Sequence, residues 1–251
     1  MIYAQFETAR QQKRKCFALL IDPDNVDPSG LLKLKSYILE SAVDFIFLGG
    51  SLVQHDNLDD CARFFKENFS IPVVLFPGDH YQITPRADAI LFLSLISGRN
   101  PDLLIGKHVL AAAHLRRSGI EVLPTGYLLV DGGTPTAVSY MSQTLPIPRN
   151  KPEIAVSTAL AGEMLGMRLI FMDAGSGACE SVSPDMVHQV KNEVNVPLIV
   201  GGGIKDGQSA LELCRAGADV IVVGNAIEKD PERINEISSV IDSFNSIRQL
   251  S

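Results

Sequence analysis

"LIVGGGIKDG", residues 198–207, takes an apolar run directly into three consecutive glycines and then into a helix start. Glycine inside a regular element is less favourable than alanine by roughly 0.5–1 kcal/mol, so a triple glycine at the end of a strand requires a reason. Without a Cβ in the way, the backbone N–H groups of this turn are free to face a bound anion. The stretch therefore predicts a strand, an anion-binding turn and a helix, in that order.

A second apolar run near the end of the chain, residues 220–223, leads into Gly224 and Asn225, with a short helix expected at residues 226–228. If both strands lie in one parallel sheet, the positive N-terminal end of that helix points toward the glycine turn. The two turns together predict a phosphate-binding site, and tight turns without a ligand are the alternative.

The unit of strand, turn and helix recurs along the whole chain. The apolar runs are rich in Ile, Val, Leu and Phe, as expected of parallel strands that are buried on both faces. About eight such units in ~250 residues match the size of a (β/α)8 barrel, so we predict a TIM barrel that forms a single domain over residues 1–251. An open, doubly wound sheet is the alternative. The expected strands are residues 17–21, 45–48, 73–76, 89–93, 121–123 with 127–130, 169–172, 198–200 and 220–223.

Capping residues, prolines and glycines between the strands predict where helices begin and end. Asp206 and Gly217 bracket one helix, and Asp230 is the expected N-cap of the last helix, with Pro231 in its first helical position. Residues 76–88 are few and include Pro and Gly, so a loop is expected to replace the helix after the third strand. The prediction is therefore a modified barrel.

Composition excludes several classes of protein. The chain has 251 residues, of which 46% are hydrophobic, and a net charge of −7, which argues against a nucleic-acid-binding surface. Its four cysteines lack C-x-x-C spacing, which argues against zinc and dithiol sites. No apolar run approaches the ~20 residues that span a bilayer, and the N-terminus lacks a signal-peptide pattern. We expect a cytoplasmic protein, with peripheral membrane contact left open.

Carboxylates and hydroxyls follow several of the expected strands, at the end where barrel enzymes carry their active sites. Asp22 and Asp24 flank Pro23, and on an extended segment their side chains point the same way. Oxygen ligands of this kind suit Mg²⁺, with Ser51 as a further ligand, although Asp-Pro-Asp is equally a helix-start turn. Asp173 follows a buried run and is a candidate general base, with a cap or loop carboxylate as the alternative.

Several motifs in order along nearly the whole chain resemble those of the geranylgeranylglyceryl phosphate synthase family, which includes bacterial heptaprenylglyceryl phosphate synthases. The "AGSG" form and the insertion around residues 131–150 are similar to the second branch of that family. The motifs are "LLIDPD", "FLGGS", "GKH", "PTGYLLVDGG", "FMDAGSG", "VGGGI" and "VVGNAI".

The resemblance implies a barrel in which a loop replaces one helix, and a Mg²⁺-dependent prenyltransferase. Such enzymes join the C3 hydroxyl of sn-glycerol 1-phosphate to a long prenyl diphosphate, here expected to be geranylgeranyl diphosphate, and release pyrophosphate. The products are ether-linked phospholipid precursors. The resemblance also implies a homo-oligomer that acts on small molecules and binds no nucleic acid. A heptaprenyl-specific enzyme is one alternative, and another phosphate-binding barrel enzyme, such as a sugar-phosphate isomerase, is a second.

Site residues carry over from the family onto matching positions. The metal ligands fall on Asp22 and Ser51, and Asp173 is the expected catalytic base. The usual Tyr and Glu of the family's "Y-L-E" are replaced by Phe171, which has no hydroxyl to donate, and by the shorter Asp173. The expected glycerol-phosphate contacts are Phe171, Met172, Asp173, Ala174, Gly175, Ser176, Gly177, Gly202, Gly203, Gly224 and Asn225.

Overall fold

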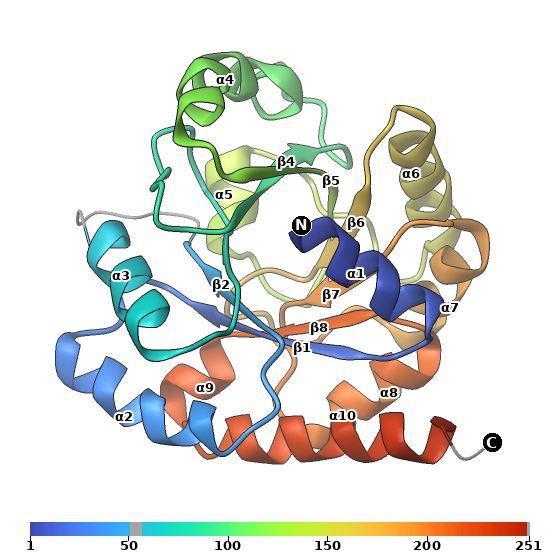
Figure 1. Ribbon diagram of the computed structural model, residues 1–251. Coiled ribbons are helices and arrows are strands. Elements are labelled where there is room, and N and C mark those ends of the chain that lie inside the picture. The colour runs from blue at the N-terminus through green and yellow to red at the C-terminus, as the bar shows by residue number, and fades with distance from the viewer. Residues whose placement is uncertain (51–56, 250–251) are drawn as a thin grey trace.

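A computed structural model describes residues 1–50 and 57–249 of the chain. Parallel strands close into a barrel in the order β1 to β8, with β8 paired to β1 (Figure 1). The predicted (β/α)8 barrel is therefore confirmed, and the alternative of an open sheet is wrong. The strands are β1 (Cys16–Ile21), β2 (Phe45–Leu48), β3 (Val73–Leu75), β4 (Ala89–Leu95), β5 (Glu121–Leu129), β6 (Leu169–Asp173), β7 (Leu198–Gly201) and β8 (Val220–Val223).

Helices surround the barrel (Figure 1). Residues 76–88, all of them described, form turns and bends and no helix, so the predicted loop after the third strand is confirmed. No helix in the described part of the chain is long and apolar enough to cross a bilayer. The helices are α1 (Ile2–Gln11), α2 (Pro28–Leu39), α3 (Leu58–Asn68), η1, a π-helix (Asp102–Gly106), α4 (Lys107–Ser118), α5 (Ala137–Ser142), α6 (Pro152–Met164), α7 (Pro184–Glu193), α8 (Gly207–Ala216), α9 (Asn225–Lys229) and α10 (Arg233–Gln249).

Several predicted strand ends differ by one or two residues, and two further differences have identifiable reasons. The fifth strand is continuous, because Pro124 keeps an extended backbone and its carbonyl still accepts the N–H of Arg168 at 2.8 Å. The last helix begins at Arg233 rather than Pro231. Asp230 still accepts the N–H of Glu232 at 3.2 Å, but the first turn uses tighter i→i+3 bonds. By contrast, α8 begins and ends as predicted, with Asp206 as N-cap and Gly217 in the left-handed region.

Side chains alternate between the barrel interior and the layer of helices, because successive Cβ atoms of a strand point to opposite faces. In β1, Ala18 and Leu20 belong to the interior cluster, and in β6 Leu169 and Phe171 do. The same alternation continued by two residues directs Asp22 and Asp173 inward at the carboxyl end of the barrel. Strand register thus decides that both acids face the barrel mouth.

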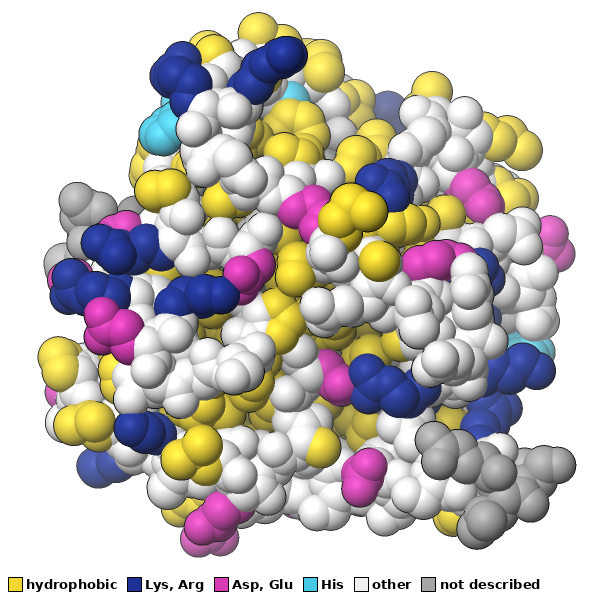
Figure 2. Space-filling view, viewed as in Figure 1, with side chains coloured by type: hydrophobic (Ala, Val, Ile, Leu, Met, Phe, Trp, Pro, Cys, Tyr) yellow, Lys and Arg dark blue, Asp and Glu magenta, His cyan; other side chains and the backbone are white. Residues whose placement is uncertain are grey.

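Helix α1 covers the opposite, amino end of the barrel (Figure 1). Phe6 is fully buried and stacks on Phe45, with their ring centroids 4.3 Å apart, and the carboxylate of Glu121 accepts the N–H groups of Ile2 and Tyr3. On this face basic and acidic side chains are interspersed rather than gathered by sign (Figure 2). Helix α1 therefore closes the amino end of the barrel.

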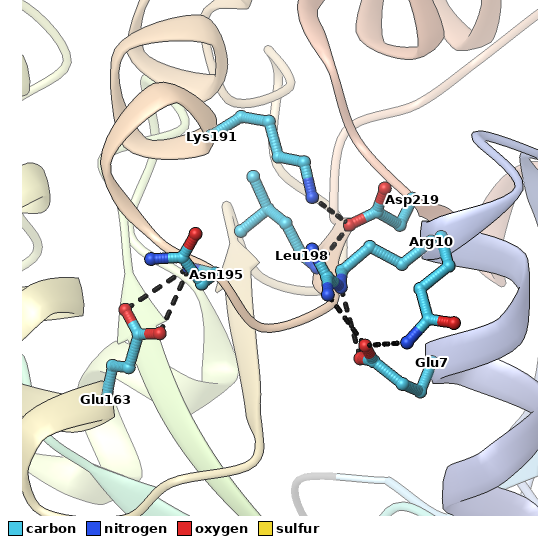
Figure 3. Close-up of polar contacts among 8 residues, drawn as sticks. Glu7, Arg10, Glu163, Lys191, Asn195, Leu198 and Asp219 are labelled. Carbon is cyan, nitrogen blue, oxygen red and sulfur yellow. Dashed lines mark hydrogen bonds and ion pairs between the residues drawn. The ribbon is translucent and has the colours of Figure 1, made fainter.

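An aspartate precedes β2, β4 and β8, and its side chain has the same role in each place. In each place the aspartate carboxylate accepts, at 2.8 Å, a backbone N–H near the start of the strand that comes before it in the chain. The same carboxylate pairs with a basic side chain. Figure 3 shows the third example, in which Asp219 binds Lys191 and the N–H of Leu198. The three carboxylates, Asp44, Asp88 and Asp219, bind the N–H groups of Phe17, Val73 and Leu198 and the cations of Arg14, Lys66 and Lys191.

Asp219 is the most deeply buried of these anchors, and Lys15, also buried, lies 3.9 Å from its Oδ1. We expect Asp219→Ala to lower the free energy of unfolding by about 3–5 kcal/mol, because a buried ammonium and an N–H lose their partner. The matched Asp88→Ala removes a more exposed pair and should lower it by about 1–2 kcal/mol. Urea unfolding followed by circular dichroism measures both values. Equal losses in the two variants would contradict the conclusion that the buried Asp219 stabilises the fold more than Asp88 does.

Candidate active site

The loops after β1 and β8 lie beside each other at the mouth, because these strands are hydrogen-bonded neighbours. The side-chain amide of Asn25 donates to Asp22 Oδ2 and to Glu228 Oε2, both at 3.4 Å. Asp22 thus approaches α9, the short helix that begins at Asn225, one residue before its expected start. The carboxylate and the amide-rich turn occupy one rim, as the barrel topology predicts.

Asp22 closes its own turn. Its Oδ1 accepts the N–H of Asp24 at 3.0 Å, and its carbonyl accepts the N–H of Asn25 at 3.1 Å. Of the two readings of Asp-Pro-Asp, an extended segment and a helix-start turn, the structure has the turn, because an aspartate side chain readily bonds to the backbone two residues later. Partial burial raises the pKa of Asp22, the charge of Asp24 adds to this, and the N–H of Asp24 opposes it.

Gly50, from the loop after β2, lies directly against this carboxylate. A Cβ on Gly50 would sit 2.6 Å from Asp22 Oδ2 and 2.9 Å from its Cγ, so glycine permits the approach. Ser51, the second expected metal ligand, lies outside the described residues. Within the described ranges, Asp22 forms no ion pair, and no three His, Cys, Asp or Glu side chains group as a metal cluster.

Asp173 ends β6 and is 7% exposed. Its Oδ2 accepts the phenol hydroxyl of Tyr127 at 2.5 Å, and its Oδ1 accepts the N–H of Gly175 at 2.7 Å. Burial raises the pKa of the Asp173 carboxyl, and both hydrogen bonds oppose that rise. Asp173 caps no helix and is the last residue of β6. Tyr127 was not among the residues expected from the sequence, although "TGY" in "PTGYLLVDGG" precedes the mouth on a neighbouring strand.

The close approach of the loop after β6 explains the glycines that follow β7. Gly202 has φ +76°, and a Cβ there would lie 2.6 Å from the nitrogen of Gly175 and 2.7 Å from that of Ala174. Gly203 has φ +69° and faces the backbone around Glu180 in the same way. The triple glycine thus lets the loops after β6 and β7 touch backbone to backbone.

The loop after β6 also reaches the loop after β8. Ser176 is exposed, and its hydroxyl donates to Asn225 Oδ1 at 2.8 Å. The structure therefore gathers most of the expected phosphate contacts, from Asp173 to Gly177 with Gly202, Gly203, Gly224 and Asn225. Two others lie lower in β6: Phe171 is buried in the barrel interior, and the Met172 side chain faces the helices.

An apolar cavity of about 250 Å³ opens where the helix after β3 is missing. Its lining includes Phe76 and Ile83 from the loop, Leu91 from β4, and Leu103 from η1. Gly50 and Tyr127 line it as well, so the cavity extends to residues in contact with Asp22 and with Asp173. Lys107 and Asp79 form an ion pair at 2.5 Å along its wall.

Comparison with known proteins gives consistent matches. The model of the PcrB family matches residues 9–241. A geranylgeranylglyceryl phosphate synthase of Chitinophaga pinensis is 53% identical over 240 residues, covering 96% of this chain and 95% of that protein. One of Pyrococcus horikoshii is 47% identical over 219 residues, covering 87% and 85%.

Solved structures agree with the sequence matches. The crystal structure of (S)-3-O-geranylgeranylglyceryl phosphate synthase from Thermoplasma acidophilum in complex with substrate sn-glycerol-1-phosphate has a TM-score of 0.88 and 32% identity. The match covers 96% of this chain and 98% of that one. The corresponding wild-type enzyme from Thermoplasma volcanium has a TM-score of 0.89 and 35% identity, covering 98% of both chains.

The backbone contact at Gly202 gives a prediction with a matched control. Gly202 and Gly119 share φ +76°, but a Cβ on Gly119, at the end of α4, would meet no atom within 4 Å. Both Gly→Ala changes incur roughly 1–2 kcal/mol for a left-handed alanine. Gly202→Ala should lower the free energy of unfolding by about 1–3 kcal/mol more, because its methyl group overlaps the loop after β6. Urea unfolding of the two variants measures the difference. No difference would mean that the loop after β6 shifts to accommodate the methyl group at no energetic cost.

Proposed function

The chain belongs to the PcrB family, and from this membership we propose that it joins the C3 hydroxyl of sn-glycerol 1-phosphate to geranylgeranyl diphosphate. The products are an ether-linked geranylgeranylglyceryl phosphate and pyrophosphate. The resemblance read from the motifs is confirmed, since relatives called geranylgeranylglyceryl phosphate synthase cover nearly the whole chain. The observation that carries the proposal is the meeting of an apolar cavity, an amide-rich rim and two inward carboxylates at one mouth.

The acceptor is proposed to lie among the loops after β6, β7 and β8. Two of these loops are linked by the hydrogen bond from Ser176 to Asn225, and two by the backbone contact at Gly202. Glycine-rich turns of this kind bind phosphate through N–H groups, and barrels commonly carry such a site after strands seven and eight. The Thermoplasma acidophilum enzyme, which was crystallised with sn-glycerol-1-phosphate, supports this acceptor for the family fold.

Asp22 and Ser51 are proposed to hold Mg²⁺. The fit rests on Asp22, a half-buried carboxylate that receives one short hydrogen bond from the described residues and faces the space left by Gly50. Its remaining lone pairs are hard oxygen donors of the type Mg²⁺ selects, with substrate phosphates completing the shell. When bound, Mg²⁺ would neutralise charge on the departing pyrophosphate.

Asp173 is proposed to accept the proton of the attacking hydroxyl. It lies below the Ser176 loop, so a glycerol phosphate anchored by its phosphate on that loop would direct its carbon chain toward the carboxylate. From the described residues, each oxygen of Asp173 accepts one hydrogen bond and retains a lone pair. The raised pKa suits a general base, because a stronger base removes a proton more readily.

The prenyl tail is proposed to occupy the apolar cavity between the loop after β3 and helix α4. Burial of hydrocarbon against such walls is favourable by roughly 25 cal/mol per Å². The cavity reaches Gly50 beside Asp22 and Tyr127 beside Asp173, so a tail in it would leave its diphosphate and first carbon at the mouth.

Incubation of the purified protein with radiolabelled geranylgeranyl diphosphate, sn-glycerol 1-phosphate and Mg²⁺ tests the function directly. We expect a labelled, phosphate-bearing lipid and one equivalent of pyrophosphate. A sugar-phosphate isomerase or a non-catalytic phosphate-binding protein would release no pyrophosphate under these conditions, and that result would overturn the proposal.

The metal role of Asp22 has its own test. We expect Asp22→Asn to lower turnover by at least about 100-fold, because an amide is a poor ligand for Mg²⁺. The control Asp242→Asn, an exposed position on α10, should keep wild-type turnover. Rates are measured against Mg²⁺ concentration, with thermal unfolding to confirm the fold. Near-normal turnover of Asp22→Asn at saturating Mg²⁺ would refute the proposed ligand.

The role of Asp173 as base predicts a split between rate and affinity. Asp173→Asn retains the shape and the acceptor for Gly175 but has no basic oxygen, so kcat should fall by about 100-fold or more. The Kd for sn-glycerol 1-phosphate, measured by calorimetry, should change by less than about 10-fold. Equal losses in kcat and affinity would show that the carboxylate only binds the acceptor.

A further inference from the structure

Tyr127 lies where the two proposed substrate sites meet. It belongs to β5, whose register places it beside Phe171 of β6, and its side chain is 5% exposed. Its ring lines the apolar cavity, while its hydroxyl donates to Asp173 Oδ2 at 2.5 Å. One side chain thus connects the cavity wall to the buried carboxylate.

Two phenylalanine rings that stack on each other pack against the Tyr127 ring. The ring centroids of Phe76 and Phe171 lie 6.2 Å and 5.5 Å from that of Tyr127, and they lie 5.3 Å from each other. Aromatic contacts at these separations are favourable and directional. Because the ring is buried and its backbone is held in β5, its hydroxyl has little freedom to leave the carboxylate.

Tyr127 is the side-chain donor of Asp173 within the described residues, since the second donor, Gly175, uses its backbone. Phe171 lies two residues before Asp173 on the same face of β6, but has no hydroxyl. Without Tyr127, Oδ2 would remain buried with no hydrogen-bond partner among the described residues. A buried carboxylate oxygen without a hydrogen bond is energetically unfavourable, so the hydroxyl of Tyr127 stabilises the ionised form of Asp173.

We propose that Tyr127 is the positioning residue for Asp173: its hydroxyl fixes the orientation of the carboxylate and favours its charged form beside the prenyl cavity. This inference rests on the proposed function, since it assigns a role within that reaction. The donated hydrogen bond opposes the rise in the pKa of Asp173 that burial causes. The pKa of Tyr127 is itself raised, by burial and by the carboxylate, so the phenol keeps its proton.

The reaction step balances with these roles. The acceptor oxygen forms a bond to C1 of the prenyl group, and the bond from C1 to the diphosphate oxygen breaks with its electron pair leaving on pyrophosphate. Asp173 takes the proton of the acceptor hydroxyl and later releases it to water. Tyr127 gains and loses no proton, and its hydrogen bond to Oδ2 persists throughout.

Tyr127→Phe removes only the hydroxyl and tests the proposal. We expect kcat to fall by about 10- to 100-fold, with the KM for geranylgeranyl diphosphate within about 3-fold of wild type, since the ring still lines the cavity. The acidic limb of the kcat–pH profile should move to higher pH. The sign follows because the base acts when ionised, and loss of a donor to the carboxylate raises its pKa.

The matched control is Tyr140→Phe, at a tyrosine of α5 that is 83% exposed, which should leave rate and pH profile unchanged. A general structural weakening at position 127 would lower activity without moving the acidic limb. An unmoved limb together with unchanged kcat, or a limb that moves to lower pH, would overturn the inference. Absence of product from the wild-type protein would instead refute the proposed function.

Two measurements keep the inference testable without relying on that variant's activity. A carbon-13 NMR titration of aspartate carboxyls, with Asp173→Asn providing the assignment, should show a higher pKa for Asp173 in Tyr127→Phe than in wild type. If Tyr127→Phe does not fold, 3-fluorotyrosine at position 127 strengthens the donor and should move the acidic limb to lower pH. An unchanged pKa of Asp173 in the titration, or an unmoved acidic limb with 3-fluorotyrosine, would overturn the positioning role.

Discussion

The buried carboxylate of Asp173 is the point where three neighbouring strands of the barrel make contact through polar groups. Tyr127 of β5 donates to one oxygen, the backbone after β6 donates to the other, and Gly202 after β7 packs against the same turn. The Ser176 loop above it then reaches Asn225 after β8. The geometry of the mouth depends on this contact, because displacement of the carboxylate would move the loops that are proposed to bind the acceptor phosphate.

The two ends of the barrel use aspartate in opposite ways. At the amino end, Asp44, Asp88 and Asp219 each bind a strand N–H and a basic side chain, so their charge is neutralised. At the carboxyl end, Asp22 and Asp173 receive hydrogen bonds but no ion pair from the described residues. A paired carboxylate stabilises the fold, whereas an unpaired one retains lone pairs for a metal ion or a proton. The pairing therefore separates structural acids from candidate functional ones.

The missing helix after β3 shows how a change of fold creates a site. Where another barrel would place a helix, residues 76–88 form a loop, and an apolar cavity lies between this loop, β4 and α4. The cavity reaches both mouth carboxylates through Gly50 and Tyr127. The proposed acceptor site thus lies beside a space suited to a long hydrocarbon, and this combination supports the proposed prenyl transfer over the isomerase alternative.

The sequence by itself determined the barrel, the loop after β3, the limits of α8 and the set of strand-end residues, because apolar periodicity, caps and glycines are local signals. It also carried the family motifs. Only the tertiary structure decided that Met172 faces the helices and that Tyr127 bonds to Asp173. These facts depend on strand register and on side chains 46 positions apart, for which no local pattern exists. Phe171 has no hydroxyl, and Tyr127 of the neighbouring strand donates one to Asp173, a contact that forms only when β5 and β6 pair in this register.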